Sequence, residues 1–213
     1  MASEVLGAFL SDALAISGFP LSNAPGSVAA LALQRVFQQR AEAAREVLQD
    51  ELRRGDITSL DAAGDDAAAA ILFRYLRAAQ EGAARRNLRL LAQVIRGQLS
   101  SGNLVADEFL SYADVLAPLR REEIVLLGAM AQRRDELREA APSAVQTWTM
   151  VENELFGTAM FPTRGHIKAA ARALGRSGLV LLITIWNSDL TVLSVLFDKF
   201  AEFCDFEAAS NEV

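Results

Sequence analysis

The chain has 213 residues, of which 52% are hydrophobic, and its 21 basic and 27 acidic residues leave a formal net charge of −6. This composition predicts a fully folded, helix-rich protein of one large or two small domains. A single cysteine, Cys204, excludes an internal disulfide and favours a reducing, cytoplasmic location. The amino terminus lacks a basic segment and no apolar run reaches about 18 residues, so we expect neither a signal peptide nor a membrane span.

The amino-terminal half predicts a bundle of amphipathic helices, because apolar side chains recur there every three or four residues. The expected helices cover residues 4–17, 28–54, 67–79, 83–99 and 106–117. In the second helix the apolar stripe consists of Leu33, Phe37, Ala41, Ala44, Leu48 and Leu52. A stripe this narrow suits either a helical hairpin or a seam between two copies, and we favour packing within the chain.

Two groups of charged residues accompany these helices. Asp61, Asp65 and Asp66 precede the helix at 67–79 without the spacing of a metal site, and we interpret them as caps of its free N–H groups. The helix at 83–99 is expected to turn its leucines inward and its arginines outward. The inward set is Leu88, Leu91, Ile95 and Leu99, and the outward set is Arg85, Arg86, Arg89 and Arg96.

Residues 118–213 predict three helices and then a strand, which is the order of a winged helix-turn-helix. The first helix covers residues 120–138. Thr147 is expected to cap the second helix, at 148–156, and Gly157 to end it.

The third helix is bounded by residues with restricted or unusual backbone angles. Pro162 prevents the second helix from continuing, and Thr163 is expected to cap the third. Gly178 suits the left-handed conformation that follows a helix, and the apolar run at 179–186 is interpreted as a buried strand.

The strand at 179–186 has two candidate partners, residues 158–160 and residues 189–192. If neither pairs, the region is a helical bundle with one extended segment. Thr191 is expected to cap a terminal helix, in which we interpret Cys204 as a small buried apolar residue. The apolar residues of that helix are Leu193, Leu196, Phe197, Phe200, Phe203 and Cys204.

The predicted fold is therefore mainly α. A multi-helix bundle domain at residues 1–117 is followed by a winged-helix-like domain at 118–213 with one or two short strands.

The third helix of the second domain carries the candidate functional residues. No acid occurs between Glu154 and Asp189, whereas this window holds four basic residues and the only histidine of the chain. A basic face on an acidic protein is a candidate surface for nucleic-acid phosphates. The alternative is a solvated helix face whose arginines pair with carboxylates of neighbouring helices. The candidates are Arg164, His166, Lys168, Arg172 and Arg176.

The pattern of residues 86–131 supports a family resemblance. It reads RNLRLLAQVIRGQLSSGNLVADEFLSYADVLAPLRREEIVLLGAMA, an arginine-led helix, a short helix with spaced phenylalanine and leucine, and a leucine-rich helix that opens with an acid. Two further features accompany this pattern: R-S-G-L-V at 176–180, and L-T before an aromatic helix at 190–203. Together these patterns resemble the abortive-infection alpha-like helical proteins of bacteria and prophages. The chain departs from that pattern by longer amino-terminal helices and a very apolar strand. The resemblance implies a cytoplasmic accessory protein of a phage, prophage or defence locus, with no catalytic motif to carry over.

The sequence contains no motif that is typical of an enzyme active site. No serine or cysteine has a nucleophile context, and no glycine-rich loop connects a strand to a helix. We therefore expect a non-enzymatic protein without metal, cofactor or small-molecule substrate.

Two functional hypotheses remain. The first is an interaction or regulatory protein that contacts a protein partner or a second copy, and the acidity of residues 118–213 favours it. The alternative is a winged-helix DNA-binding transcriptional regulator that uses the basic helix at 164–176.

Overall fold

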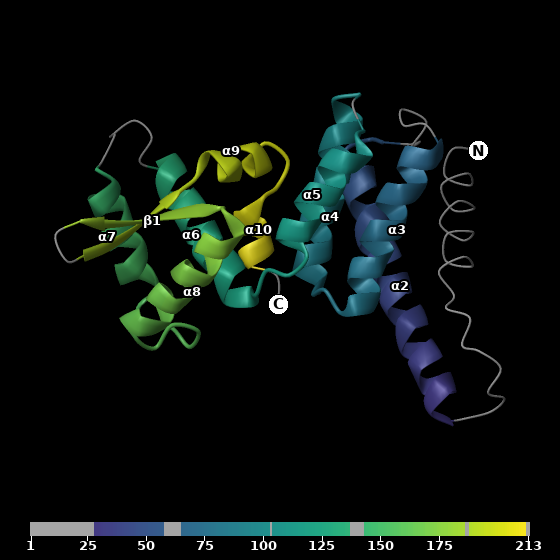
Figure 1. Cartoon of the computed structure of the whole chain (residues 1–213), viewed down its shortest axis with the longest axis horizontal. Coiled ribbons are helices and arrows are strands. Elements are labelled where there is room, and N and C mark those ends of the chain that lie inside the picture. The colour runs from purple at the N-terminus through teal and green to yellow at the C-terminus, as the bar shows by residue number, and fades with distance from the viewer. Residues whose placement is uncertain (1–27, 58–64, 103, 137–142, 186–187, 212–213) are drawn as a thin grey trace. The chain divides into compact units, whose positions relative to one another are not determined.

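The chain is described here by a computed structural model (Figure 1). The described residues are 28–57, 65–102, 104–136, 143–185 and 188–211. Within them the chain is mainly α-helical, with a small antiparallel sheet near the carboxyl terminus, which confirms the predicted mainly α class. The chain divides into two compact units, Met1–Pro118 and Leu119–Val213. The helix predicted at residues 4–17 lies outside the described residues.

The amino-terminal unit is built from helices joined by short connections. They are α2 (Val28–Arg54), α3 (Asp65–Glu81), α4 (Arg85–Ser100) and α5 (Ala106–Leu116). α2 packs against α3 and α4, and α5 packs against the same two helices (Figure 1). Leu88, Leu91, Ile95 and Leu99 of α4 are buried, as their spacing predicts.

α2 buries the second half of its predicted apolar stripe. Ala41, Ala44, Leu48 and Leu52 are at most 2% exposed, whereas Leu33 is 51% exposed. The helix ends where Asp56 adopts a left-handed conformation with a φ of 52°. The carboxyl-terminal half of α2 therefore supplies its packing surface in this unit.

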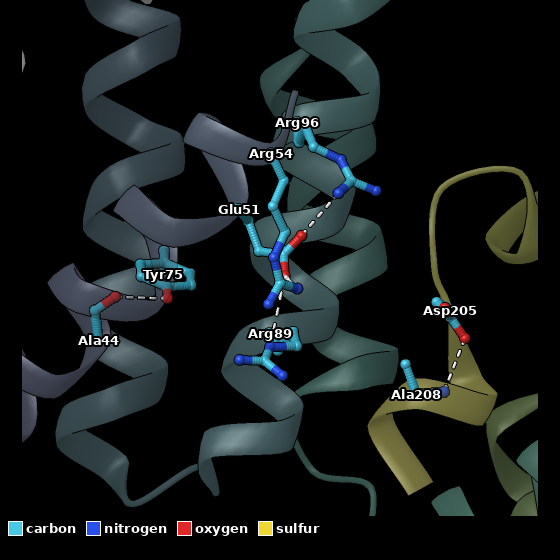
Figure 2. A network of polar contacts seen from close by, with 8 residues as sticks. All are labelled: Ala44, Glu51, Arg54, Tyr75, Arg89, Arg96, Asp205 and Ala208. Atoms are coloured by element: carbon cyan, nitrogen blue, oxygen red, sulfur yellow. Dashed lines mark hydrogen bonds and ion pairs between the residues drawn. The ribbon is translucent and has the colours of Figure 1, made fainter. Parts of the chain in front are cut away.

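The side chain of Glu51 on α2 is fully buried and lies among arginines (Figure 2). Its carboxylate oxygens lie 2.7 Å from Arg54 Nη1, 2.8 Å from Arg96 Nη1 and 3.5 Å from Arg89 Nε. A carboxylate removed from water is costly unless it is paired, and these arginines provide the pairing. The prediction that Arg89 and Arg96 point outward is wrong, because the buried carboxylate draws them to 15% and 27% exposure.

Tyr75 of α3 makes a second buried polar contact with α2. Its hydroxyl donates a 2.8 Å hydrogen bond to the carbonyl oxygen of Ala44 (Figure 2). Burial raises the pKa of the Tyr75 hydroxyl, so the group stays protonated and remains a donor. The two contacts, at Ala44 and Glu51, position α3 and α4 along the same helix.

The carboxyl-terminal unit combines helices with a β-hairpin. Its elements are α6 (Arg121–Glu136), α7 (Ala144–Leu155), α8 (Arg164–Ser177), β1 (Val180–Ile185), β2 (Ser188–Leu193), α9 (Val195–Ala201) and α10 (Phe206–Ser210). α6 is the central helix, since α7, α8 and α10 all pack against it. The close approach of α10 requires Gly128 on α6, where an added Cβ would lie 2.9 Å from the carbonyl oxygen of Phe206.

Of the two candidate partners of the strand at 179–186, the segment around residues 189–192 is the one that pairs with it. β1 and β2 pair antiparallel in a register that runs from Val180 opposite Leu193 to Ile185 opposite Ser188. The other candidate, residues 158–160, lies in the turn between α7 and α8. The all-helical alternative is therefore wrong for this unit.

Gly178 and Ser194 join the hairpin to the helices on either side. Gly178 has a φ of 77°, as predicted, and ends α8. Ser194 closes the base of the hairpin: its N–H donates to Leu179 O at 3.0 Å and its hydroxyl donates to Gly178 O at 2.6 Å. The same hydroxyl accepts from Phe197 N and so caps α9.

Two of the residues predicted to cap helices, Thr147 and Thr191, do not do so. α7 is capped by Ser143, which exchanges hydrogen bonds with Gln146 in a capping box, so Thr147 is a residue within the helix. Thr191 lies inside β2 opposite Leu182 and is 3% exposed, because pairing with β1 extends the strand to Leu193.

The predicted terminal helix is divided into two short helices, α9 and α10. The second begins after Asp205, whose side chain accepts a 2.8 Å hydrogen bond from Ala208 N (Figure 2). Cys204, in the connection, is buried, as its apolar spacing predicts.

We predict that Glu51→Gln lowers the free energy of unfolding of the amino-terminal unit by about 3 kcal/mol. The substitution leaves three arginines facing a neutral group, and the estimate takes the lower end of the cost of breaking a buried pair because the arginines are partly exposed. Hydrogen exchange of α4 amides in the full chain measures the change in this unit. The matched control is Asp50→Asn, which removes the same charge one residue earlier from a 3.6 Å pair with exposed Arg53. Asp50→Asn should lower the free energy of unfolding by less than about 1 kcal/mol. Equal effects of the two variants would contradict the role given to Glu51.

We predict opposite effects for the same substitution at two glycines of the α8 region. Gly178→Ala should lower the free energy of unfolding by about 1–2 kcal/mol, because alanine is strained at a φ of 77°. Gly165→Ala, in the first turn of α8, should be neutral or add about 0.5 kcal/mol through helix propensity. Urea denaturation followed by tryptophan fluorescence reports on this unit, which contains both tryptophans. A neutral result at Gly178 would argue against its role at the junction.

Candidate functional site

The turn between α7 and α8 sets the direction of the candidate helix. Gly157, at a φ of 82°, ends the preceding helix as predicted. Thr158 stabilises the turn, since its hydroxyl donates to Leu155 O at 2.8 Å and accepts from Phe161 N at 3.2 Å. Phe161 is 1% exposed, so the turn is anchored in the core of the unit. α8 therefore leaves the turn in a fixed orientation.

α8 begins after Thr163, the predicted cap position. The Thr163 side chain makes no capping hydrogen bond to the backbone and instead lies 2.8 Å from His166 Nδ1. One face of the helix is buried, through Ile167, Ala170, Ala171 and Leu174. The candidate residues lie on the remaining surface and are all exposed: Arg164, His166, Lys168, Arg172 and Arg176.

Arg164 is held against α7. Its guanidinium lies 2.7 Å from Asn153 Oδ1 and 3.3 Å from Glu152 Oε2, and it covers the ring of Phe156 at 5.3 Å. The contact with Glu152 uses the charge of the guanidinium, and the contact with Phe156 uses its planar face. Arg164 thus links the first turn of α8 to α7.

Arg172 is paired across the unit with β2. Its Nη2 lies 3.1 Å from Asp189 Oδ2, and both side chains are well exposed, at 68% and 42%. Such a surface pair adds little stability, but it neutralises part of the basic helix. The acid-free window therefore overstates the positive charge, because its arginines find carboxylates from outside the window.

Lys168 and Arg176 are the remaining cations of α8. Neither forms an ion pair with any residue in the described part of the chain. Glu154, the acid that bounds the window, is engaged elsewhere: it accepts a 2.8 Å hydrogen bond from Arg133 of α6, and this bond raises the pKa of Arg133. Of the five candidates, two remain as unpaired cations.

The hairpin beside α8 exposes apolar rather than basic side chains. Leu181, Leu182 and Ile183 are 53%, 44% and 40% exposed. The apolar run predicted a buried strand, and this is wrong for the middle of β1, because among residues 180–184, whose burial is described, only Val180 is buried. A run of apolar residues does not reveal by itself which of its members the rest of the chain covers.

The two faces of the hairpin have different surroundings. Leu182 and Thr184 face α8, where they line a surface cavity of about 230 Å³ together with Trp148, Lys168, Arg172 and Asp189. Leu181 and Ile183 alternate with them and lie on the opposite face. Apolar area is therefore exposed on both sides of the same strand.

The acids considered for metal binding do not assemble into a site among the described residues. The helix starts earlier than predicted: α3 begins at Asp65, so Asp65 and Asp66 lie inside its first turn rather than before it, while Asp61 lies outside the described part of the chain. No group of three or more histidine, cysteine, aspartate or glutamate side chains is close enough to hold a metal ion in the part searched, which is the described residues. None of the helices there combines the length and apolar character that a bilayer crossing requires.

Comparison of the chain with family models, with curated proteins and with solved structures finds no match. The surfaces of the chain itself therefore provide the evidence for its function.

Proposed function

We propose that this is a non-enzymatic interaction or regulatory protein whose carboxyl-terminal unit binds protein through its hairpin. The unit has the element order of a winged helix, three helices followed by two antiparallel strands. The observation that carries the proposal is the exposure of three large apolar side chains, Leu181, Leu182 and Ile183, in successive positions of one strand. Leu181 and Ile183 lie on one face of the strand and Leu182 lies on the other, so apolar area is exposed on both faces of the hairpin. Apolar exposure gathered on one element in this way favours an interaction site.

The charges of α8 support a protein contact over a nucleic-acid contact. Two of its cations are already paired, and the neighbouring hairpin adds the acid Asp189 and no base. In nucleic-acid binders, phosphate neutralisation by lysine and arginine supplies most of the affinity. We further propose a cytoplasmic location and a role in a phage, prophage or defence locus, on the basis of the single cysteine and the family resemblance.

The hairpin proposal is tested with a photo-reactive phenylalanine in place of Ile183. In the cells that encode the chain, light should join this variant to a protein, because position 183 lies on the exposed apolar strand. The control places the same group at Arg53, whose side chain is 76% exposed on the amino-terminal unit. A variant at 183 that yields no more protein adduct than the one at 53 would remove the proposal.

DNA binding is the second candidate, and the unpaired Lys168 and Arg176 favour it. If they contact phosphates, binding to random duplex DNA should weaken steeply with salt. The double substitution Lys168→Glu and Arg176→Glu should then reduce the slope of log affinity against log salt by about 2, one for each lost contact. Arg53→Glu is the matched control. Fluorescence anisotropy across a salt series measures both, and absence of binding at low salt by a folded sample would eliminate this candidate.

A further inference from the structure

The outer edge of β1 carries unpaired backbone groups in the middle of the strand. Within the described residues the sheet has β1 and β2 as its only strands, so β1 has a strand neighbour on one side. The hydrogen bond from Ser194 N to Leu179 O makes Leu179 and Ser194 a hydrogen-bonded pair. Because such pairs alternate along an antiparallel ladder, the N–H and C=O groups of Leu182 and Thr184 point away from β2.

This edge lacks the features that keep sheet edges from pairing. Soluble proteins protect exposed edges with lysine, proline, bulges or inward-pointing charges. β1 reads VLLITI, without charge or proline, and it pairs with β2 in a continuous register without a bulge. Leu181, Leu182 and Ile183 are exposed beside the open backbone groups. The edge therefore offers both hydrogen bonds and apolar side chains to an added strand.

We infer that the partner of this edge is β1 of a second copy, paired antiparallel about a two-fold axis. This inference rests on the proposed function and names its partner. In such a pair residues on the same face meet, so Leu181 and Ile183 of one copy lie beside Ile183 and Leu181 of the other. The contact brings apolar side chains together on a strand of six uncharged residues and buries no unpaired charge.

The open edge of β1 carries no charge that would repel an identical edge. The acid of the hairpin, Asp189, lies on β2 opposite Thr184 and is paired with Arg172 of α8. Its charge is therefore balanced within one copy, on the side of β1 away from the open edge. Two identical edges can therefore meet without bringing like charges together.

The size of the edge sets the strength of the dimer. A single strand of six residues belongs with the small interfaces, below about 1,200 Å² of total buried area, which are typical of weak or transient complexes. We therefore expect monomer and dimer to exchange, with a dissociation constant in the micromolar range.

The test is sedimentation equilibrium of the full chain over a range of concentrations. Wild type should shift from 23.0 kDa toward twice that mass as concentration rises. Leu181→Lys should raise the dissociation constant at least about tenfold, because lysine on the edge disfavours strand pairing. Leu182→Pro should do the same, since it removes an outward N–H without removing a bond to β2. Circular dichroism confirms that each variant is folded, and retention of the dimer by folded Leu181→Lys overturns the inference.

Two control variants separate this dimer from other associations. Val195→Lys changes an apolar residue that is 76% exposed but lies outside the strand, and it should leave the dissociation constant unchanged. Leu33→Lys tests the exposed part of the α2 stripe, which is the other candidate seam between copies. Loss of the dimer through Leu33→Lys alone would overturn the inference.

The photo-reactive group at position 183 distinguishes failure of the inference from failure of the proposed function. An adduct of two copies of this chain supports both. A chain that stays at 23.0 kDa at every concentration, yet forms an adduct with a different protein, overturns self-pairing and leaves the proposed function standing. Absence of any protein adduct removes both.

Discussion

The junction of Gly178 and Ser194 determines what the carboxyl-terminal unit presents to its surroundings. A left-handed glycine turns the chain out of α8, and Ser194 then bonds to Gly178 O and Leu179 O on the opposite side of the hairpin. These bonds set the register of β1 against β2. Since side chains alternate along a strand, a shift of one residue would exchange the two faces and turn Leu182 away from α8.

Arginine has two different uses in this protein, and burial of the partner decides between them. In the amino-terminal unit, the fully buried Glu51 requires compensation, so Arg89 and Arg96 become part of the interior. On α8, Arg172 meets the exposed Asp189, and the pair neutralises charge with little effect on stability. The first network organises a fold, whereas the second changes the character of a surface.

The proposed function follows from this difference in surface character. A helix that presented all of its cations would suit phosphate binding, but Arg164 and Arg172 of α8 are paired with acids. Lys168 and Arg176 are the cations of α8 that pair with no acid in the described part of the chain, and they lie beside an apolar hairpin. Exposed leucine and isoleucine on an uncharged strand favour contact with another protein surface. The open edge of the same strand supplies the hydrogen bonds that direct such a contact toward strand pairing.

Local sequence patterns predict helices at the positions of α2 to α8, the buried face of α8 and the left-handed conformation of Gly178. These features depend on residues within a few positions of one another, through the helix period and the allowed backbone angles. Three other features follow from contacts between elements: arginines of α4 turn toward Glu51, Arg172 pairs with Asp189, and residues 188–193 form a strand rather than the start of a helix. Each of these outcomes depends on contacts between different elements, where burial and pairing outweigh the local preference of a segment.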